Sequence, residues 1–454
     1  MEYNELRSQY PKMYYHGYAI EEDEKTIRIT YDLEIESLSS FAPTFTLSKP
    51  THGVMMKDYR LFQEAVFSLG MVELISYWKL ACPPHVIVEC GALSEAQVTW
   101  WKKLYFHGLG EFFYTNGIAA DMDTFMELVS TGNKAHGKEI DYTFHGNLIP
   151  VGGGKDSFVS LDVLKPYKEE NYAFVIGNVK SAIHASHAAG YTDEHFINPM
   201  RTLDKRMLEL NKQGYLNGHT PFSAMAAFAS YLTALVYQCR YIVLSNESSA
   251  NESTVKDSSV NHQYSKTFEF EVDFNTYVKD YLDPSVHYFS LLRGISELQI
   301  AAIFSTLKQY HSVFRSCNVG QKEEKWCGHC AKCLFVCIMM QAFLSKEEVI
   351  SIFGRDMLND ESLKDLFEEL TGIVDNKPFE CVGTRDEVNL AVMMAIRRFE
   401  KDGVSLPKLY QYYLTTSYAD VYRNKEIDMM EYQKENLVPA QYEALLLKRL
   451  EELK

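Results

Sequence analysis

The stretch NLIPVGGGKDSFVSLDVL, residues 147–164, decides the fold. It begins with an apolar run at 147–151, passes through three consecutive glycines and continues at 158–164 with apolar residues at helical spacing. This order predicts a strand, a tight loop and a helix whose N-terminal amides face an anion. We therefore expect a phosphate-binding loop at residues 152–157.

The residues of this loop suit a nucleotide. Glycines let the main chain approach phosphate oxygens without an intervening Cβ, Lys155 adds a positive charge and Ser157 adds a hydroxyl. Beside phosphates, the carboxylate of Asp156 is explained best as a magnesium ligand or as a helix-start residue. The expected nucleotide-binding set is Gly152, Gly153, Gly154, Lys155, Asp156 and Ser157, and Asp156 is also the expected ligand of a catalytic Mg²⁺.

Two common nucleotide motifs do not fit the loop. A Walker loop needs Ser or Thr directly after its Lys, where Asp156 stands, and a Rossmann loop needs its third Gly where Ser157 stands. The pattern resembles instead the PP-loop of the N-type ATP pyrophosphatases, Ser-Gly-Gly-any-Asp-Ser, which cleave ATP to AMP and pyrophosphate. Gly152 replaces the leading Ser of that pattern. An ordinary glycine-rich turn is the alternative.

Two more strands are predicted at 172–176 and 241–245, and polar residues follow each of them. Short apolar strands that alternate with helices over 145–270 indicate a parallel sheet with helices on its faces. In such a sheet the ligand lies beyond the carboxyl ends of the strands. We therefore add Asn178, Asn246 and Glu247 to the expected nucleotide-binding residues.

The predicted fold class is α/β, with a parallel-sheet PP-loop core, an N-terminal α/β domain and a helical C-terminal region. Residues 1–140 mix strand-like and helical runs, residues 141–344 contain the loop and a cysteine cluster, and residues 345–454 are charged and helical. Strands are expected at 26–33 and 85–88, and helices at 59–78, 94–106, 345–353, 361–370, 385–401 and 439–453.

Composition limits the classes of partner. The 454 residues include 45 basic and 61 acidic side chains, and the net charge of −16 disfavours binding to a polyanion such as tRNA. The N-terminus lacks the apolar segment of a secretory signal, and the uncharged stretch 222–239 is better explained as a buried helix than as a membrane span. We expect a cytoplasmic protein that binds neither nucleic acid nor membrane, and its oligomeric state stays open.

Four cysteines are clustered near residue 325. Cys317, Cys327, Cys330 and Cys333 are separated by nine, two and two residues. Four thiolates at such spacing suit a tetrahedral Zn²⁺ with no open position, which predicts a structural ion, and free thiols are the alternative. A tetracysteine cluster after a PP-loop also resembles 7-cyano-7-deazaguanine synthase, so zinc alone does not decide the function.

Several further segments point to one family. These segments are RTLD at 201–204, LELN at 208–211, LNGHTP at 216–221, SNE at 245–247, NHQYSK at 261–266 and CAKC at 330–333. With the loop, with HGLGEF at 107–112 and with FECVGT at 379–384, they resemble the MurL family of UDP-N-acetylmuramoyl-L-alanyl-L-glutamate epimerases. The resemblance implies inversion of the terminal L-glutamate of a peptidoglycan precursor, with ATP and Mg²⁺ used and AMP and pyrophosphate released.

Chemistry suggests roles for the remaining residues. A carboxylate joined to AMP loses its negative charge, so that a base can remove the neighbouring α-proton. We expect His219 and His262 to transfer protons because imidazole titrates near neutral pH, although a lone histidine is often structural. Arg201 and Lys266 are candidates for the UDP phosphates or the γ-carboxylate, with solvated surface charge as the alternative.

Three other functions compete with epimerisation. In a ligase or nitrile synthase of the deazaguanine type, ammonia or an amine would capture the adenylate. Modification of a tRNA base is disfavoured by the acidic composition. A nucleotide-binding regulator without catalysis would have little use for Asp156 beside the phosphates.

Overall fold

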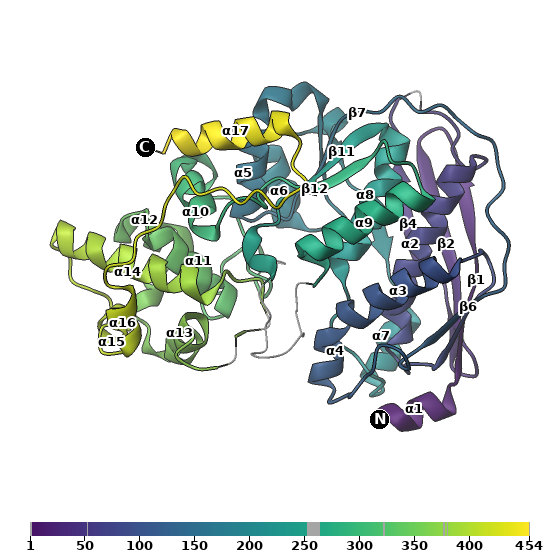
Figure 1. The fold of residues 1–454 in the computed structure, drawn as a ribbon, viewed down its shortest axis with the longest axis horizontal. Helices are drawn as coiled ribbons and strands as arrows, with labels where there is room; N and C mark the ends of the chain where they lie inside the picture. Colours follow the sequence, from purple (N-terminus) through teal and green to yellow (C-terminus); the bar gives the residue numbers. More distant parts are fainter. Residues whose placement is uncertain are drawn as a thin grey trace.

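A computed structural model describes residues 2–51, 53–251, 264–320, 323–375, 377–378 and 380–453. Two β-sheets and a group of C-terminal helices lie side by side along the longest axis of the molecule (Figure 1). The first sheet is at the right in this view, the second is near the centre and the C-terminal helices are at the left. The chain is therefore a mixed α/β protein with a helical C-terminal region.

The central sheet is parallel throughout. Its strands occur in the order β12 (His287–Ser290), β11 (Cys239–Leu244), β7 (His145–Pro150), β8 (Asn171–Phe174) and β9 (Phe196–Ile197). In the centre of the sheet Leu148 lies opposite Ile242 on one side and Tyr172 on the other. The strands predicted at 147–151, 172–176 and 241–245 are confirmed with ends shifted by one or two residues. Strands β9 and β12 were not predicted.

Helices cover both faces of this sheet, as the alternating pattern indicated. They include α5 (Lys155–Val163), α6 (Lys180–Ala188), α8 (Phe222–Tyr237), α9 (Phe268–Tyr281) and α10 (Glu297–Thr306). Helix α8 is buried, and it contacts both β11 and helix α2 (Arg60–Trp78) of the N-terminal half. None of the helices within the described residues is long and apolar enough to cross a membrane.

The N-terminal sheet contains seven strands, and one of them comes from the middle of the chain. Strand β10 (Met200–Thr202) pairs antiparallel with β4 (Thr44–Ser48) at the edge of the sheet. The remaining strands are β1 (Lys12–Glu22), β2 (Thr26–Ile35), β3 (Ser39–Phe41), β5 (His85–Val88) and β6 (Glu127–Ser130). The helices of this half are α1 (Tyr3–Gln9), α2, α3 (Glu95–Gly108), α4 (Gly110–Thr115) and α7 (Lys205–Lys212).

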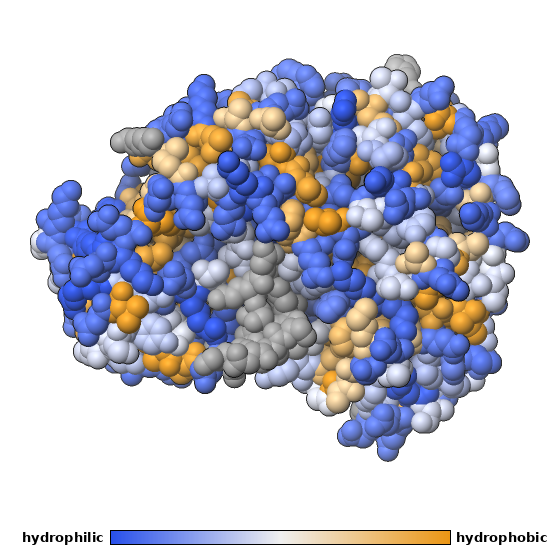
Figure 2. Space-filling model, in the orientation of Figure 1, coloured by the Kyte–Doolittle hydropathy of each residue, from blue (hydrophilic) through white to orange (hydrophobic). Residues whose placement is uncertain are grey.

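The C-terminal region is helical, as predicted. It consists of α11 (Ala331–Gln341), α12 (Lys346–Phe353), α13 (Lys364–Thr371), α14 (Arg385–Asp402), α15 (Lys408–Tyr413), α16 (Ser417–Tyr422) and α17 (Ala440–Glu451). The helix expected at 361–370 starts later than predicted, because residues 361–363 form a 3₁₀ turn. The surface in the orientation of Figure 1 is largely hydrophilic with separated apolar patches (Figure 2).

The last helix returns to the parallel sheet (Figure 1). Its Tyr442 hydroxyl donates a 2.6 Å hydrogen bond to Oδ1 of Asn147 in β7, and its Arg449 pairs with Asp162 of α5 at 3.0 Å. Asn147 is fully buried, and its side-chain amide nitrogen donates a 2.7 Å hydrogen bond to Oδ1 of Asn171 in β8. Helix α17 therefore supplies one member of a buried hydrogen-bond network on β7, the strand that leads to the glycine loop.

A Tyr442→Phe substitution is expected to lower the free energy of unfolding by about 1–3 kcal/mol, because it leaves a buried amide oxygen without a donor. Urea denaturation measures the loss. Tyr14→Phe is the matched control, since the Tyr14 hydroxyl donates to Glu36 in a partly exposed position. This control should change stability by less than about 0.5 kcal/mol. Equal losses in the two variants would contradict the role of the buried network.

Candidate functional site

The carboxyl ends of β7, β8 and β11 open into one cleft. The glycine loop follows β7, and residues 245–247 follow β11, so two of the predicted strand-end sites line the same space. Segments far apart in the sequence complete the wall. Its polar residues are Asp156, Ser157, Ser223, Ser245, Asn246, Glu247, Lys266, Ser316, Asn318, Lys332 and Cys381.

The glycine loop is held by close backbone packing. Gly153 has φ +87°, and a Cβ there would lie 2.9 Å from the carbonyl carbon of Ser181 in α6. The amide of Gly152 donates to Oγ of Ser157 at 3.0 Å, which closes the loop on the first turn of α5. The carbonyl of Gly153 accepts from the amide of Arg315 at 2.8 Å. The loop is therefore fixed from three sides.

Gly152 differs from Gly153 in its surroundings. A Cβ at Gly152 would meet only Oγ of Ser157, at 3.9 Å, and the residue is exposed. A side chain would therefore fit here, and the absence of the leading Ser of the PP-loop pattern does not reflect a steric limit.

Lys155 points into the protein. Its ammonium bonds to the carboxylates of Asp156 and Glu297 and is almost fully buried. Burial works against this charge, but Asp156 and Glu297 outweigh it and keep the pKa of Lys155 above its ordinary value. Its ammonium therefore stabilises the two carboxylates and is not directed at a ligand in the cleft.

Asp156 binds the buried ammonium of Lys155 and also lines the cleft. It occupies the first turn of α5, and 24% of its side chain is exposed. Burial opposes ionisation, but Lys155, Lys332 and Lys266 together lower the pKa of Asp156. The carboxylate is thus charged near neutral pH and reaches the cleft, as a magnesium ligand must.

Glu297 is the first functional residue that sequence reasoning missed. It is buried as the first residue of α10, and its amide donates to Glu387 of α14 at 2.7 Å. A sequence signal existed, since Ser296 and Gln299 form a capping box that marks a helix start a short turn after β12. Nothing in the local pattern, however, relates that helix to Lys155.

Arg293 is the second residue missed. It is buried, and its guanidinium donates to the carbonyl of Glu247 at 2.7 Å and to the carbonyl of Lys266 at 2.6 Å. Its charge is balanced by Glu271 at 3.0 Å. Arg293 therefore holds two cleft residues that lie on either side of 252–263.

The other predicted site residues occupy different positions. Asn246 donates to Ser290 at 3.1 Å and Glu247 accepts from Ser249 at 3.0 Å, and both line the cleft. Asn178 is exposed and is not among the described residues of the cleft wall.

Arg201 and His219 are not among the described residues of the cleft wall. Arg201 forms a bidentate pair with Glu73 of α2 at 2.7 and 2.9 Å, so the negative partner of its guanidinium lies within the N-terminal half. His219 lies 3.5 Å from the carboxylate of Glu111 and is likewise not among the described residues of the cleft wall. His262 lies outside the described residues.

The four clustered cysteines do come together. The sulfur atoms of Cys317, Cys327, Cys330 and Cys333 all lie within 4.8 Å of one another. Backbone amides of Gly320 and Cys327 point at Sγ of Cys317, at 3.1 and 3.4 Å. Such amides support a metal-bound thiolate, so this donor set fits one Zn²⁺. Ser316, Asn318 and Lys332 adjoin these cysteines in the sequence and line the cleft, which makes the cluster a support of its wall.

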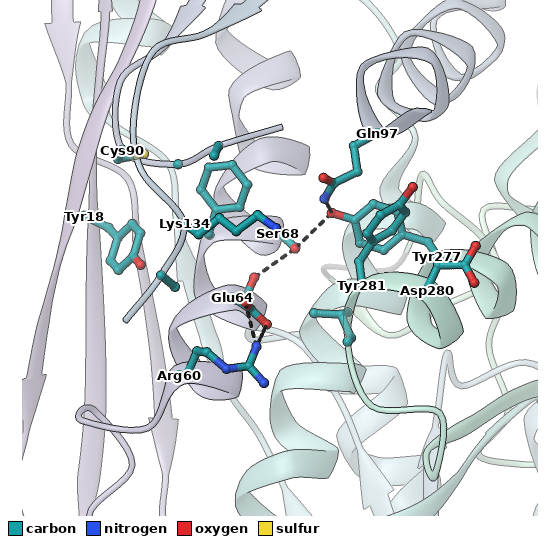
Figure 3. A pocket seen from close by; sticks show the side chains of 15 residues that line it. Tyr18, Arg60, Glu64, Ser68, Cys90, Gln97, Lys134, Tyr277, Asp280 and Tyr281 are labelled. Atoms are coloured by element: carbon teal, nitrogen blue, oxygen red, sulfur yellow. Dashed lines mark hydrogen bonds and ion pairs between the residues drawn. The ribbon is translucent and has the colours of Figure 1, made fainter. Parts of the chain in front are cut away.

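A second cavity lies between the N-terminal sheet and helices α2, α3 and α9 (Figure 3). Half of the side chains labelled there bind one another: Arg60 pairs with Glu64 at 2.8 Å, and the Tyr277 hydroxyl contacts Ser68 and Gln97 at 3.4 Å each. Groups that are already paired offer little to a ligand. The cleft at the strand ends is therefore the stronger candidate for the functional site.

Comparison with known proteins identifies close relatives. Residues 4–291 match the MurL N-terminal domain and residues 310–414 match the MurL C-terminal domain. The chain is similar to a UDP-N-acetyl-alpha-D-muramoyl-L-alanyl-L-glutamate epimerase of Xanthomonas oryzae pv. oryzae, with 33% identity over 74% of this chain and 76% of that protein. It is also similar to proteins of the same name from Micromonospora sp., with 33% identity over 72% of this chain and 73% of that protein, and from Salinispora tropica, with 32% identity over 72% of each. No solved structure matches the chain.

Adding a methyl group should destabilise the protein at one glycine of the loop and have little effect at its neighbour. Gly153→Ala is expected to cost at least about 1–2 kcal/mol of stability, because its left-handed backbone and the nearby carbonyl carbon of Ser181 both resist a Cβ. Gly152→Ala, the matched control, should stay within about 0.5 kcal/mol. Chemical denaturation of the two variants measures the difference, and a Gly153→Ala protein as stable as its control would refute this view of the loop.

The cysteine cluster is expected to hold one zinc per chain, measurable by inductively coupled plasma mass spectrometry of the purified protein. Cys333→Ser should lose the metal and lower Tm by at least about 5 °C, because a structural zinc stabilises the fold that supplies its ligands. Cys337→Ala is the control, since Cys337 is buried one turn further along α11 and lies outside the cluster. Retention of zinc by Cys333→Ser would contradict the proposed ligand set.

Proposed function

The chain belongs to the MurL family, and from this premise we propose that it inverts the terminal L-glutamate of UDP-N-acetylmuramoyl-L-Ala-L-Glu to D-glutamate with the use of ATP and Mg²⁺. Relatives that share about a third of its residues carry the name of an epimerase of this substrate. The observation that carries the ATP-dependent mechanism is the partly exposed Asp156 at the start of α5, in a cleft that also contains Lys266 and Lys332.

The proposed chemistry explains why an epimerase would need ATP. Removing the α-proton next to an ionised carboxylate would place carbanion charge beside an existing negative charge. Transfer of AMP to the α-carboxylate forms a mixed anhydride and releases pyrophosphate. Its carbonyl can then accept the electron pair as an enolate, and a proton delivered to the opposite face inverts the centre. Water finally cleaves the adenylate and releases AMP.

Residues of the cleft suit these steps. Backbone amides of Gly153 and Gly154 at the N-terminus of α5 would suit the phosphates of ATP, and the carboxylate of Asp156 would hold a Mg²⁺ that offsets their negative charge. Lys266 and Lys332 supply the positive charge that Lys155, held by Glu297, does not direct into the cleft. Zn²⁺ on the four cysteines would serve the structure alone, since all four positions are filled by protein.

The decisive experiment uses ATP, Mg²⁺ and UDP-N-acetylmuramoyl-L-Ala-L-Glu in deuterated water. We expect release of AMP, D-glutamate after hydrolysis of the product, and deuterium at its α-carbon by mass spectrometry. Absence of AMP would eliminate adenylation. Formation of AMP only when ammonia is supplied would favour the ligase or nitrile synthase instead.

Asp156→Asn should reduce AMP formation by at least about 100-fold, because the neutral amide is a poor magnesium ligand. Asp162→Asn is the matched control: Asp162 lies on the same helix but pairs with Arg449 of α17. It should form AMP at a rate within a factor of about two of the parent. Equal loss in both variants would indicate damage to α5 and not removal of a metal ligand.

A further inference from the structure

Epimerisation at the glutamate α-carbon requires a base that reaches the cleft. Of the two histidines expected from the sequence, His219 lies beside Glu111 and is not among the described residues of the cleft wall, and His262 is outside the described residues. A base for this step would come from the other groups that line the cleft with Asp156 and Ser157.

Cys381 lines this cleft, and two lysines hold it. The ammonium of Lys266 lies 3.1 Å from Sγ of Cys381, and the ammonium of Lys332 bonds to the backbone carbonyl of Cys381. The backbone of Lys266 is held in turn by the buried Arg293, whose guanidinium donates to the Lys266 carbonyl at 2.6 Å. The sulfur is thus positioned through both its side chain and its main chain.

The charges around Cys381 favour the thiolate. An adjacent ammonium stabilises a cysteine thiolate, which is the nucleophilic and basic form. The interaction also acts in the other direction. The Cys381 sulfur is the main cause that keeps the pKa of Lys266 above its ordinary value, although burial of Lys266 works against this. The other charged side chains on the described cleft wall are Lys332, Asp156 and Glu247.

Other cysteines of the chain lack this environment. Cys82, Cys239 and Cys337 are buried, and burial raises the pKa of each thiol. Cys90 lines the second cavity, where burial likewise raises the pKa of its thiol (Figure 3). Among the described cysteines outside the metal cluster, Cys381 is the one that lies in the cleft wall with a lysine ammonium at hydrogen-bonding distance from its sulfur.

We propose that the Cys381 thiolate removes the α-proton of the adenylated glutamate, with Lys266 as the residue that positions and activates it. This inference rests on the proposed function. The S–H bond forms as the Cα–H bond breaks, and the C–H electron pair moves into the Cα–C bond while the carbonyl oxygen takes the negative charge. A proton from water then adds to the opposite face of Cα, and the thiol returns its proton to solvent.

The test separates proton transfer from adenylation. In deuterated water with ATP, Mg²⁺ and the UDP-muramoyl dipeptide, Cys381→Ala should still form AMP at a rate within about fivefold of the parent, while deuterium entry at the α-carbon falls at least about 100-fold. Cys90→Ala is the matched control and should leave both rates unchanged. Formation of AMP by Cys381→Ala also demonstrates that the variant is folded.

Each remaining outcome decides the proposal. If the parent protein forms no AMP, the proposed function itself is wrong. If the parent exchanges deuterium and Cys381→Ala exchanges it equally fast, only the assignment of the base is wrong. Joint loss of AMP and exchange in Cys381→Ala would overturn it as well, because Cys381 would then serve nucleotide binding or folding.

A second readout needs no substrate. Iodoacetamide alkylation of Cys381, followed at the peptide level by mass spectrometry, should be at least about fivefold slower in Lys266→Gln than in the parent, because the thiolate loses its counter-charge. Alkylation of Cys90 is the internal control. An unchanged rate at Cys381 would remove Lys266 as the activating group and overturn the proposal.

Discussion

The buried ion group of Lys155, Asp156 and Glu297 is the interaction on which the rest of the site depends. It joins the first turn of α5 to the first residue of α10, and thereby fixes the end of the glycine loop to the helix that packs against α5. Charges removed from water destabilise a fold unless they are paired and hydrogen-bonded, so this group tolerates few alternative geometries. The backbone amide of Glu297 also donates a hydrogen bond to the carboxylate of Glu387 in α14. This bond ties the C-terminal helices to the helix that holds Lys155.

Around this centre the chain assembles one cleft from segments that are distant in sequence. The strand ends provide the floor, Arg293 fixes Glu247 and Lys266, and the residues that adjoin the cysteine cluster provide part of the wall. Residues 379–384, whose resemblance to the family had no evident purpose in the sequence, contribute Cys381 to the wall. The proposed mechanism needs both a nucleotide site and a base within reach of one carbon atom, and residues for both roles line this cleft.

Local features of the fold could be predicted from the sequence, whereas the partners of charged side chains could not. The strand, loop and helix at 147–164 follow from hydrophobic spacing and glycine, and the cysteine cluster follows from its spacing. Lys155 and Arg201 were expected to bind a ligand because they are cationic, but Glu297 and Glu73, far away in the sequence, determine where each points. Strand β9 has only two residues and β12 carries polar ends, so neither showed a pattern that distinguishes it from a loop.

Strand β10 has a consequence for how the chain folds. The N-terminal sheet obtains its edge strand from residues 200–202, which are synthesised only after three of the five strands of the parallel sheet, and until then β4 presents unpaired backbone groups. An unpaired edge is a template for association with another chain, and pairing over such a sequence separation is slow. A nascent or truncated chain that ends before residue 200 would therefore be prone to aggregate, and the two halves of the protein are expected to mature together during translation and not one after the other.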